Sequence, residues 1–502
     1  MEIHRRALVL AVCTLACAQE GGSAADTDDA GDSTLGSGDP SEGDFTGSPT
    51  SSPDGSSGGS EGSSASTNGS ATTSPGDTSS SGEDTGEPVV CMDDCHFVRA
   101  GASGSGSDWD DALPALPDEL ERGHVYFVAA GSYPEYTFDD ADGEPIRVLR
   151  ATASDHGTDA GWDPTYADGL AELGPLVFSA PNVELDGRGA TRIVGTFEST
   201  VVDIAASNVT LRGCDVDGNF TEDGGQHTDG ACSGMSIVGD NVIVEGNVIH
   251  DAADDGVAMT ASNGLVFAGN TVHSLYGCGT DGGCGPCYNG HSDGLELYDV
   301  ADSQIVGNLI YDVASTSTFF FGNWADELGE GPSEYCENVL VANNLLYAPD
   351  TGFVMYIEDA RGVQLFSNVL WGVHQGAYGG LSIGVNVEDL DVYDNAILSI
   401  NYDHIGGSYD AAEHRGDYNL FAVSLGQWSD GANDVVASDP GFVGINGADD
   451  PPVDAPTPED FAPGDGSPLV GAGWIGDASV PIPATDFFGT TRADPPNIGA
   501  IE

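Results

Sequence analysis

The sequence predicts an all-β protein built as a solenoid, on the evidence of a repeated motif, its period and its alternation of apolar residues. The motif has a few alternating apolar residues, a small residue that is usually Asn, and two or three further apolar residues. It occurs seven times between residues 214 and 398, and where no insertion intervenes the Asn recurs after 23, 24 or 27 residues, the period of a solenoid. The motif positions are Cys214, Asn247, Asn270, Asn308, Asn344, Asn368 and Asn395.

Each repeat is expected to form short strands that stack on the next repeat. A single unit cannot bury its apolar side alone, whereas stacked units build one continuous core. Segments such as 242–244 and 295–297 alternate in the manner of strands, and helical periodicity is nearly absent. Stacking at the inter-strand spacing of ~4.8 Å would let each buried Asn amide bond to the coils above and below. The sequence therefore predicts an asparagine ladder.

With this signature, the chain from about residue 96 to residue 502 resembles the right-handed parallel β-helix superfamily, the pectate-lyase-like fold. The resemblance implies a right-handed parallel β-helix. It does not name a reaction, because the fold hosts lyases, hydrolases, epimerases, phage spikes and adhesins. The side chains on the coils have to indicate the function.

The first 17 residues are predicted to be an export signal, with Arg5 and Arg6 followed by a short apolar run. Cys17 follows an imperfect lipobox and is the expected lipidation site, and we favour this interpretation because a long polar tether follows. Cleavage by a signal peptidase at an Ala-x-Ala type site, followed by secretion, is the alternative. Residues 18–90 are rich in Gly, Ser, Thr and Asp and predict a disordered tether. Both interpretations place the protein outside the cytoplasm, on the outer cell surface or secreted.

Residues 91–181 are expected to begin the solenoid and to cap it. Residues 108–113 predict a short helix that covers the open end of the first coil, and residues 124–128 predict a strand. The coils are expected over residues 182–401, with long insertions at 274–290 and 322–337. Residues 402–502 are expected to form the last coils and a C-terminal cap, a lid on the core.

Export gives the cysteines an oxidising environment, in which an even number suggests disulfides. Cys91 with Cys95 and Cys214 with Cys232 are plausible local pairs. The remaining four are expected to pair among themselves, and a zinc site is the alternative for them. These four are Cys278, Cys284, Cys287 and Cys336.

The composition excludes some partners and some chemistry. The net charge is −70, from 12 basic against 82 acidic residues, and the chain contains no lysine. Nucleic acid is therefore not an expected partner, because phosphate contacts need clustered Lys and Arg. Several β-helix lyases use a lysine to abstract the proton beside a uronate carboxylate, and that mechanism is excluded here. The base would have to be His, Tyr, Arg or a carboxylate.

Three strands that follow a Gly, at 255–260, 293–298 and 351–358, predict the substrate-binding surface. Alternation sends Val257, Leu295 and Phe353 inward, together with Met259, Leu297 and Met355. The residues between them should face outward and line up on neighbouring coils as tyrosines with acids beside them, a surface suited to sugar rings. The expected substrate-binding residues are Glu296, Tyr298, Tyr356 and Glu358.

The turns before these strands predict the catalytic residues. Asp255 and Asp293 should occupy equivalent positions in consecutive coils, ~5 Å apart. Two carboxylates this close either share a proton or bind a cation, so Asp254, Asp255 and Asp293 are candidate ligands of a calcium ion. Tyr288 and His291 precede Asp293 and could act as acid or base.

The sequence thus favours a tethered, monomeric β-helix that acts on a polysaccharide or cell-surface glycan by lyase, epimerase or hydrolase chemistry, touching the membrane only through a lipid anchor. Asp255, Asp293, His291 and Tyr288 are its candidate catalytic residues, and it needs no organic cofactor. The alternative is a non-catalytic, adhesin-like surface scaffold that binds glycans.

Overall fold

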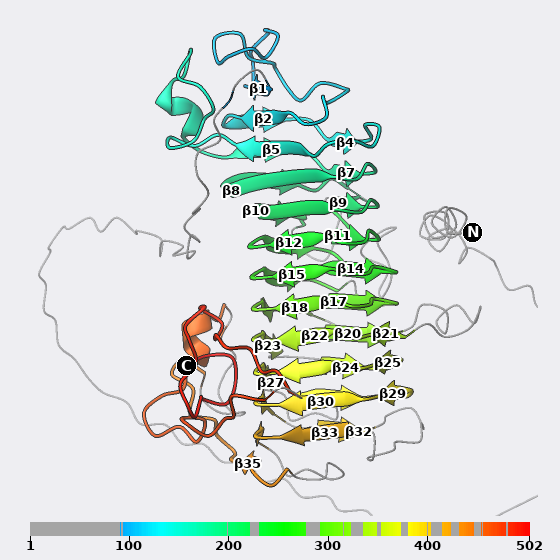
Figure 1. The fold of residues 1–502 in the computed structure, drawn as a ribbon, viewed down its shortest axis with the longest axis vertical. Coiled ribbons are helices and arrows are strands. Elements are labelled where there is room, and N and C mark those ends of the chain that lie inside the picture. The colour runs from blue at the N-terminus through cyan, green and yellow to red at the C-terminus, as the bar shows by residue number, and fades with distance from the viewer. Residues whose placement is uncertain are drawn as a thin grey trace, which may run out of the picture. The chain divides into compact units, whose positions relative to one another are not determined.

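The chain winds into coils whose strands stack along one axis (Figure 1). The computed structural model describes residues 91, 94–197, 199–220, 230–277, 292–314, 316–322, 335–348, 353–372, 380–398, 400–402, 414–422, 431–445, 453, 455–477 and 480–502. The strands form three sheets, and successive coils pair in parallel along each of them. The solenoid predicted from the repeat is confirmed.

The first and largest sheet contains two ladders of strands that share the long strands β8 and β10. The first ladder consists of β1 (Cys95–Val98), β2 (Val125–Val128), β5 (Ile146–Arg150), β8 (Val183–Val194), β10 (Val209–Asp217), β12 (Ile243–Glu245), β15 (Val266–Ala268), β18 (Gln304–Val306), β22 (Leu340–Ala342), β26 (Gln364–Phe366), β30 (Leu390–Tyr393) and β33 (His414–Asp417). The second ladder adds β3 (Gly131–Tyr133), β6 (Ala171–Leu173), β13 (Val248–Ala252), β16 (Thr271–Leu275), β19 (Leu309–Tyr311), β23 (Leu345–Ala348), β27 (Val369–Gly372), β31 (Ala396–Ile397), β34 (Leu420–Phe421) and β35 (Val435–Val436).

The other two sheets complete the coils. The second sheet consists of β4 (Tyr136–Phe138), β7 (Leu176–Phe178), β9 (Thr200–Ile204), β11 (Ser233–Ile237), β14 (Val257–Thr260), β17 (Asp293–Tyr298), β20 (Ser317–Gly322), β24 (Phe353–Ile357), β28 (Leu381–Ile383) and β32 (Ile400–Tyr402). The third consists of β21 (Cys336–Glu337), β25 (Ala360–Arg361) and β29 (Val387–Glu388).

A column of hydrogen-bonded asparagines, the asparagine ladder, stabilises the turns that connect the two rows of strands in the first sheet. Asn308 is representative: its Oδ1 accepts from the backbone N of Asn270 at 2.9 Å, and its Nδ2 donates to Asn344 Oδ1 at 2.9 Å and to Phe267 O at 3.0 Å. Equivalent bonds recur at each motif Asn from Asn247 to Asn395; they begin at the backbone N of Cys214, which donates to Asn247, and continue to Asn419. The residue before each Asn has a left-handed backbone, for example Gly307 at φ 67°. The predicted ladder is confirmed, and it extends one coil further.

The core is built from apolar rows in register along the second sheet. Val257, Leu295, Phe319, Met355 and Leu381 follow one another across β14, β17, β20, β24 and β28, and all are fully buried. The alternation predicted for β14 and β17 is confirmed.

The register predicted for β24 was wrong. Phe353 does not share the row of Leu295: it pairs with Ser317, and its side chain is partly exposed. The error arose because the Asp-Gly turns of residues 255–256 and 293–294 served as the alignment marks, whereas β20, which lies between β17 and β24, has no such turn.

The predicted capping helix is also wrong. The helices among the described residues are two 3-10 turns, η1 (Pro164–Ala167) and η4 (Pro458–Phe461). Residues 108–113 form turns instead, because Asp108 Oδ1 accepts from Asp111 N at 2.8 Å and Leu113 bonds with the exposed edge of β1. The Leu113 N donates to Phe97 O, and Arg99 N donates to Leu113 O, both at 2.8 Å. The segment covers the strand edge by pairing with it.

The C-terminal residues pack on the side of the coils. Tyr347 and Trp371, on the outer face of β23 and β27, form a buried cluster with Phe442, Phe461 and Ile501. Figure 1 shows this segment beside the last coils. The predicted lid on the core is therefore a cover on the outer face of the second ladder.

Candidate functional site

The outward-facing residues of β17, β20 and β24, with Glu358 directly after β24, form what we call the acid–aromatic wall: Glu296, Tyr298, Phe320, Tyr356 and Glu358. Glu296, Phe320 and Tyr356 follow one another in register on consecutive coils. Their chain neighbours Leu295 and Leu297 point into the core, so the wall points away from it. The structure thus places all four predicted substrate-binding residues on one surface.

Each tyrosine of the wall is bonded to a carboxylate two residues away. Tyr298 donates its hydroxyl proton to Glu296 Oε1 at 2.6 Å, and Tyr356 donates to Glu358 Oε2 at 2.8 Å. The order is reversed between the two strands, Glu-x-Tyr on β17 and Tyr-x-Glu on β24. Register therefore places one Glu and one Tyr on either side of the coil that carries Phe320.

The ring of Phe320 lies between the two tyrosines. Its centroid is 5.8 Å from that of Tyr298, at 60°, and 5.6 Å from that of Tyr356, with the rings nearly parallel at 5°. Gly322 makes this possible, because a Cβ there would lie 2.3 Å from Phe320 Cε1. Phe320 and Glu358 are partly exposed, whereas Glu296, Tyr298 and Tyr356 are only 5–6% exposed.

Asp255 and Asp293 are neighbours on consecutive coils, as predicted. The backbone N of Asp293 donates to Asp255 Oδ1 at 2.9 Å, and the N of Gly256 donates to the carbonyl of Asp293 at 2.9 Å. Asp254, Asp255 and Asp293 are all less than 10% exposed. Asp255 therefore has a structural task, joining two coils, in addition to any chemical one.

The glycine that follows each Asp serves close packing. A Cβ on Gly256 would lie 2.6 Å from the carbonyl of Gly294 and 2.6 Å from Val272 Cγ1. The Asp-Gly repeat thus reflects the tight approach of successive coils. Close packing alone accounts for the motif, whether or not the acids take part in a reaction.

Two of the predicted catalytic residues, Tyr288 and His291, lie outside the described residues, as do Cys17, Cys278, Cys284 and Cys287.

Phe320 was missed by the sequence analysis. The signal was the apolar run Phe319-Phe320-Phe321 before Gly322, whose central residue alternation would have turned outward.

A second polar cluster, also missed, lies on the outer face of the second ladder around His250. Its Nε2 lies 2.7 Å from Asp215 Oδ1, and its Nδ1 lies 2.8 Å from Asp251 Oδ2. Arg192 Nε donates to Asp215 Oδ2 at 2.7 Å. The ring of His273 stacks on that of His250 with centroids 5.1 Å apart. The cluster draws on four consecutive coils, those of β8, β10, β13 and β16, which is why no local motif revealed it.

The pKa values of the two stacked histidines are shifted in opposite directions. Burial disfavours the charged form of His250, but hydrogen bonds to Asp215 and Asp251 outweigh it and raise its pKa to about 9. Burial, and then repulsion from His250, lower the pKa of His273 to about 4. At neutral pH the cluster therefore holds one imidazolium ion stacked on one neutral imidazole.

This arrangement predicts a pH-dependent stability. The raised pKa of His250 stabilises the folded chain fully below its unfolded value of about 6.5, and the contribution is lost as pH rises through about 9. Between pH 6 and pH 10 the wild type should lose up to about 3 kcal/mol of unfolding free energy through His250, and the His250→Gln variant should not show that part of the loss. Urea denaturation at both pH values measures this. Equal pH dependence in the wild type and the variant would contradict the assignment.

The cysteines correct part of the predicted disulfide pattern. A disulfide joins Cys91 and Cys95. Cys214 does not pair with Cys232: it is a free, buried thiol whose backbone N begins the asparagine ladder, while Cys232 is disulfide-bonded elsewhere. Cys336 is also free and fully buried, and burial raises its pKa to about 12. Both thiols belong to the buried core, so the predicted pairing of Cys336 with another of the last four cysteines is wrong.

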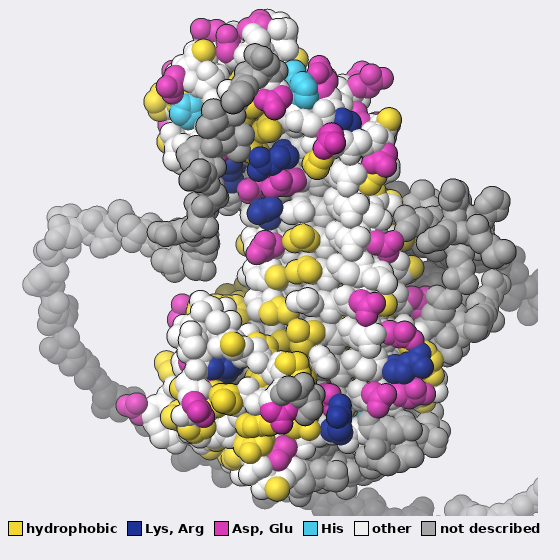
Figure 2. All heavy atoms as spheres, in the orientation of Figure 1, with side chains coloured by type: hydrophobic (Ala, Val, Ile, Leu, Met, Phe, Trp, Pro, Cys, Tyr) yellow, Lys and Arg dark blue, Asp and Glu magenta, His cyan; other side chains and the backbone are white. Residues whose placement is uncertain are grey.

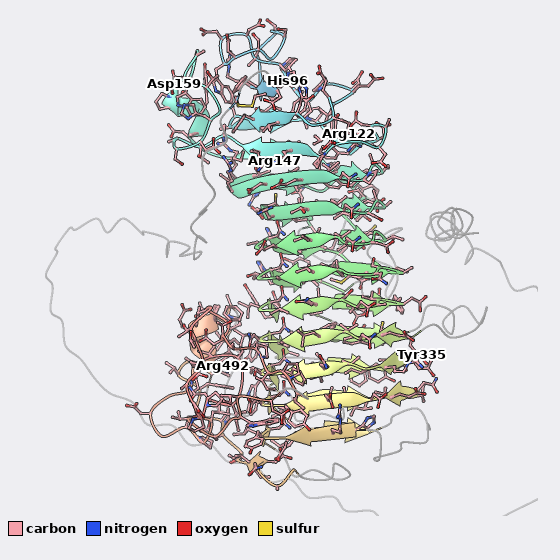
Figure 3. The ribbon with its side chains drawn as sticks, viewed as in Figure 1. His96, Arg122, Arg147, Asp159, Tyr335 and Arg492 are labelled. Atoms are coloured by element: carbon pink, nitrogen blue, oxygen red, sulfur yellow. A yellow bond between two sulfur atoms is a disulfide. The ribbon has the colours of Figure 1, made fainter. Side chains whose placement is uncertain are left out.

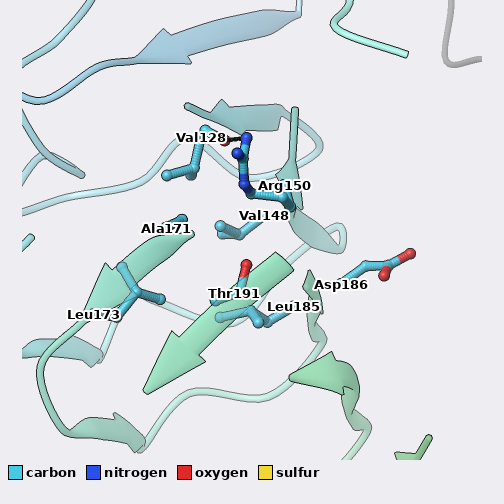
Figure 4. Close-up of a pocket in the computed structure, with 8 residues that line it drawn as sticks. All are labelled: Val128, Val148, Arg150, Ala171, Leu173, Leu185, Asp186 and Thr191. Atoms are coloured by element: carbon cyan, nitrogen blue, oxygen red, sulfur yellow. Dashed lines mark hydrogen bonds between the residues drawn. The ribbon is translucent and has the colours of Figure 1, made fainter. Parts of the chain in front are cut away.

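A small pocket lies between the first coils (Figure 4). Five aliphatic side chains line it together with Asp186, Thr191 and the buried Arg150. That guanidinium donates to backbone carbonyls, including those of Val128 at 3.2 Å and Gly169 at 3.0 Å. Its charge is used to hold the N-terminal loops.

Comparison with known proteins agrees with the fold. Residues 195–287 match a family described as a right handed beta helix region. No curated protein matches the chain. Among solved structures it is similar to pectate lyase Pel9A, with 13% identity, a TM-score of 0.48 and coverage of 82% of this chain and 97% of that chain. It is similar to a rhamnogalacturonan lyase, with 14% identity, a TM-score of 0.41 and coverage of 70% and 90%. It is also similar to PfbA, a surface adhesin of Streptococcus pneumoniae, with 9% identity, a TM-score of 0.35 and coverage of 52% and 72%.

The strand pairing shows an all-β parallel β-helix solenoid, as the sequence analysis expected, and residues 195–287 match the right handed beta helix region. None of the helical turns in the described part of the chain has the length and apolarity that a membrane crossing requires.

Proposed function

We propose that the protein binds a polysaccharide on the acid–aromatic wall and cleaves or epimerises it there. The observation that carries this proposal is the partly exposed ring of Phe320, flanked on neighbouring coils by two Tyr–Glu pairs. Sugar rings present apolar faces that stack on aromatic side chains, and hydroxyls that bond to carboxylates at their rims. Phe320 supplies the first contact and the pairs supply the second.

The same pairs supply groups for proton transfer. The Tyr298 hydroxyl donates to the Glu296 carboxylate at 2.6 Å. A proton can therefore pass from Tyr298 to Glu296 when this carboxylate acts as a base. This suits a chain without lysine. Asp255, Asp293, His291 and Tyr288 remain our candidates for the partner acid or base, and calcium at Asp254, Asp255 and Asp293 remains a proposal.

We further propose that the chain is exported and tethered through Cys17, so that the wall meets glycans outside the cell. The predicted leader and the polar segment 18–90 support this.

A product assay tests the proposed activity. The full chain is incubated with uronate-containing and neutral polysaccharides, and ultraviolet absorbance and reducing ends are followed. We expect one substrate class to give product: unsaturated ends would indicate elimination, and reducing ends alone would indicate hydrolysis. Phe320→Ala should raise KM for that substrate about tenfold by removing the stacking surface. No product from any glycan, together with unchanged configuration of the ring carbons in uronates, would refute enzymatic activity.

A non-catalytic glycan-binding scaffold is the second candidate. It is favoured by the burial of Glu296 and Tyr298, each 5% exposed, because groups this buried do not reach a sugar that rests on the more exposed Phe320. Glycan binding that is weakened by Phe320→Ala, in the absence of any product, would support this alternative.

A further inference from the structure

The first coil carries a cluster of two histidines and a glutamate that is separate from the wall and from the His250 cluster. His96 lies on β1, and His124 and Glu121 lie in the turn before β2. One ligand atom from each lies within 4.8 Å of the other two. Figure 3 labels His96 at the N-terminal end of the solenoid, and Figure 2 shows histidine side chains on the surface at that end.

Two imidazole nitrogens already face each other. His96 Nε2 lies 3.0 Å from His124 Nδ1. Two nitrogens bound to one tetrahedral Zn²⁺ at about 2.0–2.1 Å would lie about 3.3 Å apart, so the nitrogen pair has to open by a few tenths of an ångström, and the two rings have to turn so that both nitrogens point at the ion. Glu121 Oε2 lies 3.5 Å from the other nitrogen of His124, and this side chain is 65% exposed, so its carboxylate has room to turn toward the nitrogen pair.

The backbone holds the three residues in place. His96 stacks on Tyr126, with centroids 4.8 Å apart, and the Tyr126 hydroxyl accepts from the backbone N of Glu121 at 2.8 Å. Gly123 makes the turn with φ 81°, and His124 N bonds to Glu121 O at 3.2 Å. The disulfide of Cys95 lies next to His96 on the chain. The two histidines are therefore held side by side before any ion binds, and Glu121 supplies the ligand that has to turn toward them.

We propose that His96, His124 and Glu121 bind a divalent transition metal ion, with Zn²⁺ as its simplest representative. Two imidazoles and one carboxylate suit zinc, whereas calcium prefers oxygen ligands. Three protein ligands leave one position for water, which fits a site at the surface. The ion would tie β1 to the turn before β2 and so clamp the first coil.

The His250 cluster is the weaker metal candidate. Asp217, His250 and Asp251 also bring ligand atoms together. Both ring nitrogens of His250, however, are already bonded to carboxylates, and Arg192 balances part of the negative charge.

Metal titration of the full chain, stripped with a chelator, tests the proposal. Zn²⁺ is titrated in competition with a chromophoric chelator, and Co²⁺ is followed by visible absorbance. We expect one equivalent to bind to the wild type and to raise its melting temperature, since a ligand that binds only the folded state stabilises it. Ca²⁺ in large excess should not displace it.

The variants locate the ion. His96→Gln and His124→Ala should each weaken binding at least 30-fold, and Glu121→Gln about tenfold. The matched control is His156→Ala: His156 also faces an acid three residues away, Asp159 at 3.0 Å, but stacks on Trp162 and has no second histidine partner among the described residues. It should bind as the wild type does. Unchanged affinity in both His96→Gln and His124→Ala, or loss in His156→Ala alone, would overturn the proposal. Circular dichroism of each variant confirms that the coils are intact.

Discussion

The substitution Glu296→Gln is expected to lower kcat on the polysaccharide substrate by about 100-fold or more, with KM changed less than about threefold. Glutamine has the shape of glutamate and still accepts the bond from Tyr298, which is 2.6 Å long in the wild type. The coil should therefore stay folded. What is lost is the negative charge that lets the pair take up a proton. Steady-state kinetics of the purified variant measures both constants.

Glu245→Gln is the matched control, because Glu245 is an exposed glutamate on β12, on a different sheet. It should leave kcat unchanged. Tyr298→Phe should reproduce most of the loss, since it removes the other member of the pair. A Glu296→Gln variant with wild-type kcat would remove Glu296 from the mechanism and leave the wall as a binding surface only.

The second large effect concerns the asparagine ladder. Asn308→Ala should lower the free energy of unfolding by about 3–5 kcal/mol, because it removes four hydrogen bonds and leaves buried backbone groups without partners. These groups are the backbone N of Asn270, bonded at 2.9 Å, and the carbonyl of Phe267, bonded at 3.0 Å. Asn308 is fully buried, so water cannot replace the lost bonds. Urea denaturation measures the difference.

Asn263→Ala supplies the comparison, since Asn263 is exposed at a turn of the same region. It should change the free energy of unfolding by less than about 0.5 kcal/mol. If Asn308→Ala were as stable as Asn263→Ala, the ladder would be a passive consequence of the coil and not a source of its stability.

The parts of the fold that repeat could be predicted from the sequence. Asn247, Asn270 and Asn308 share one motif, and a period near 24 residues leaves few structures other than a solenoid. The parts that occur once could not. Residues 108–113 have the composition of a helix start, but the unpaired edge of β1 offers them backbone bonds that a helix cannot match.

The candidate site shows the same division. Alternation within one strand placed Glu296 and Tyr298 correctly on the outer face. Phe320 was missed because its coil lacks the Asp-Gly turn used to align the others. The His250 cluster depends on Asp215, 35 residues earlier and one coil away, so register had to be known before the contact could be seen.

The most direct test of the account is a crystal structure of the Glu296→Gln variant bound to an oligosaccharide of the substrate. We predict a sugar ring stacked on Phe320, with its hydroxyls within hydrogen-bond distance of residue 296 and Glu358. An oligosaccharide bound elsewhere, for example over Arg192 and His250 on the other sheet, with Phe320 uncovered, would contradict the assignment of the acid–aromatic wall.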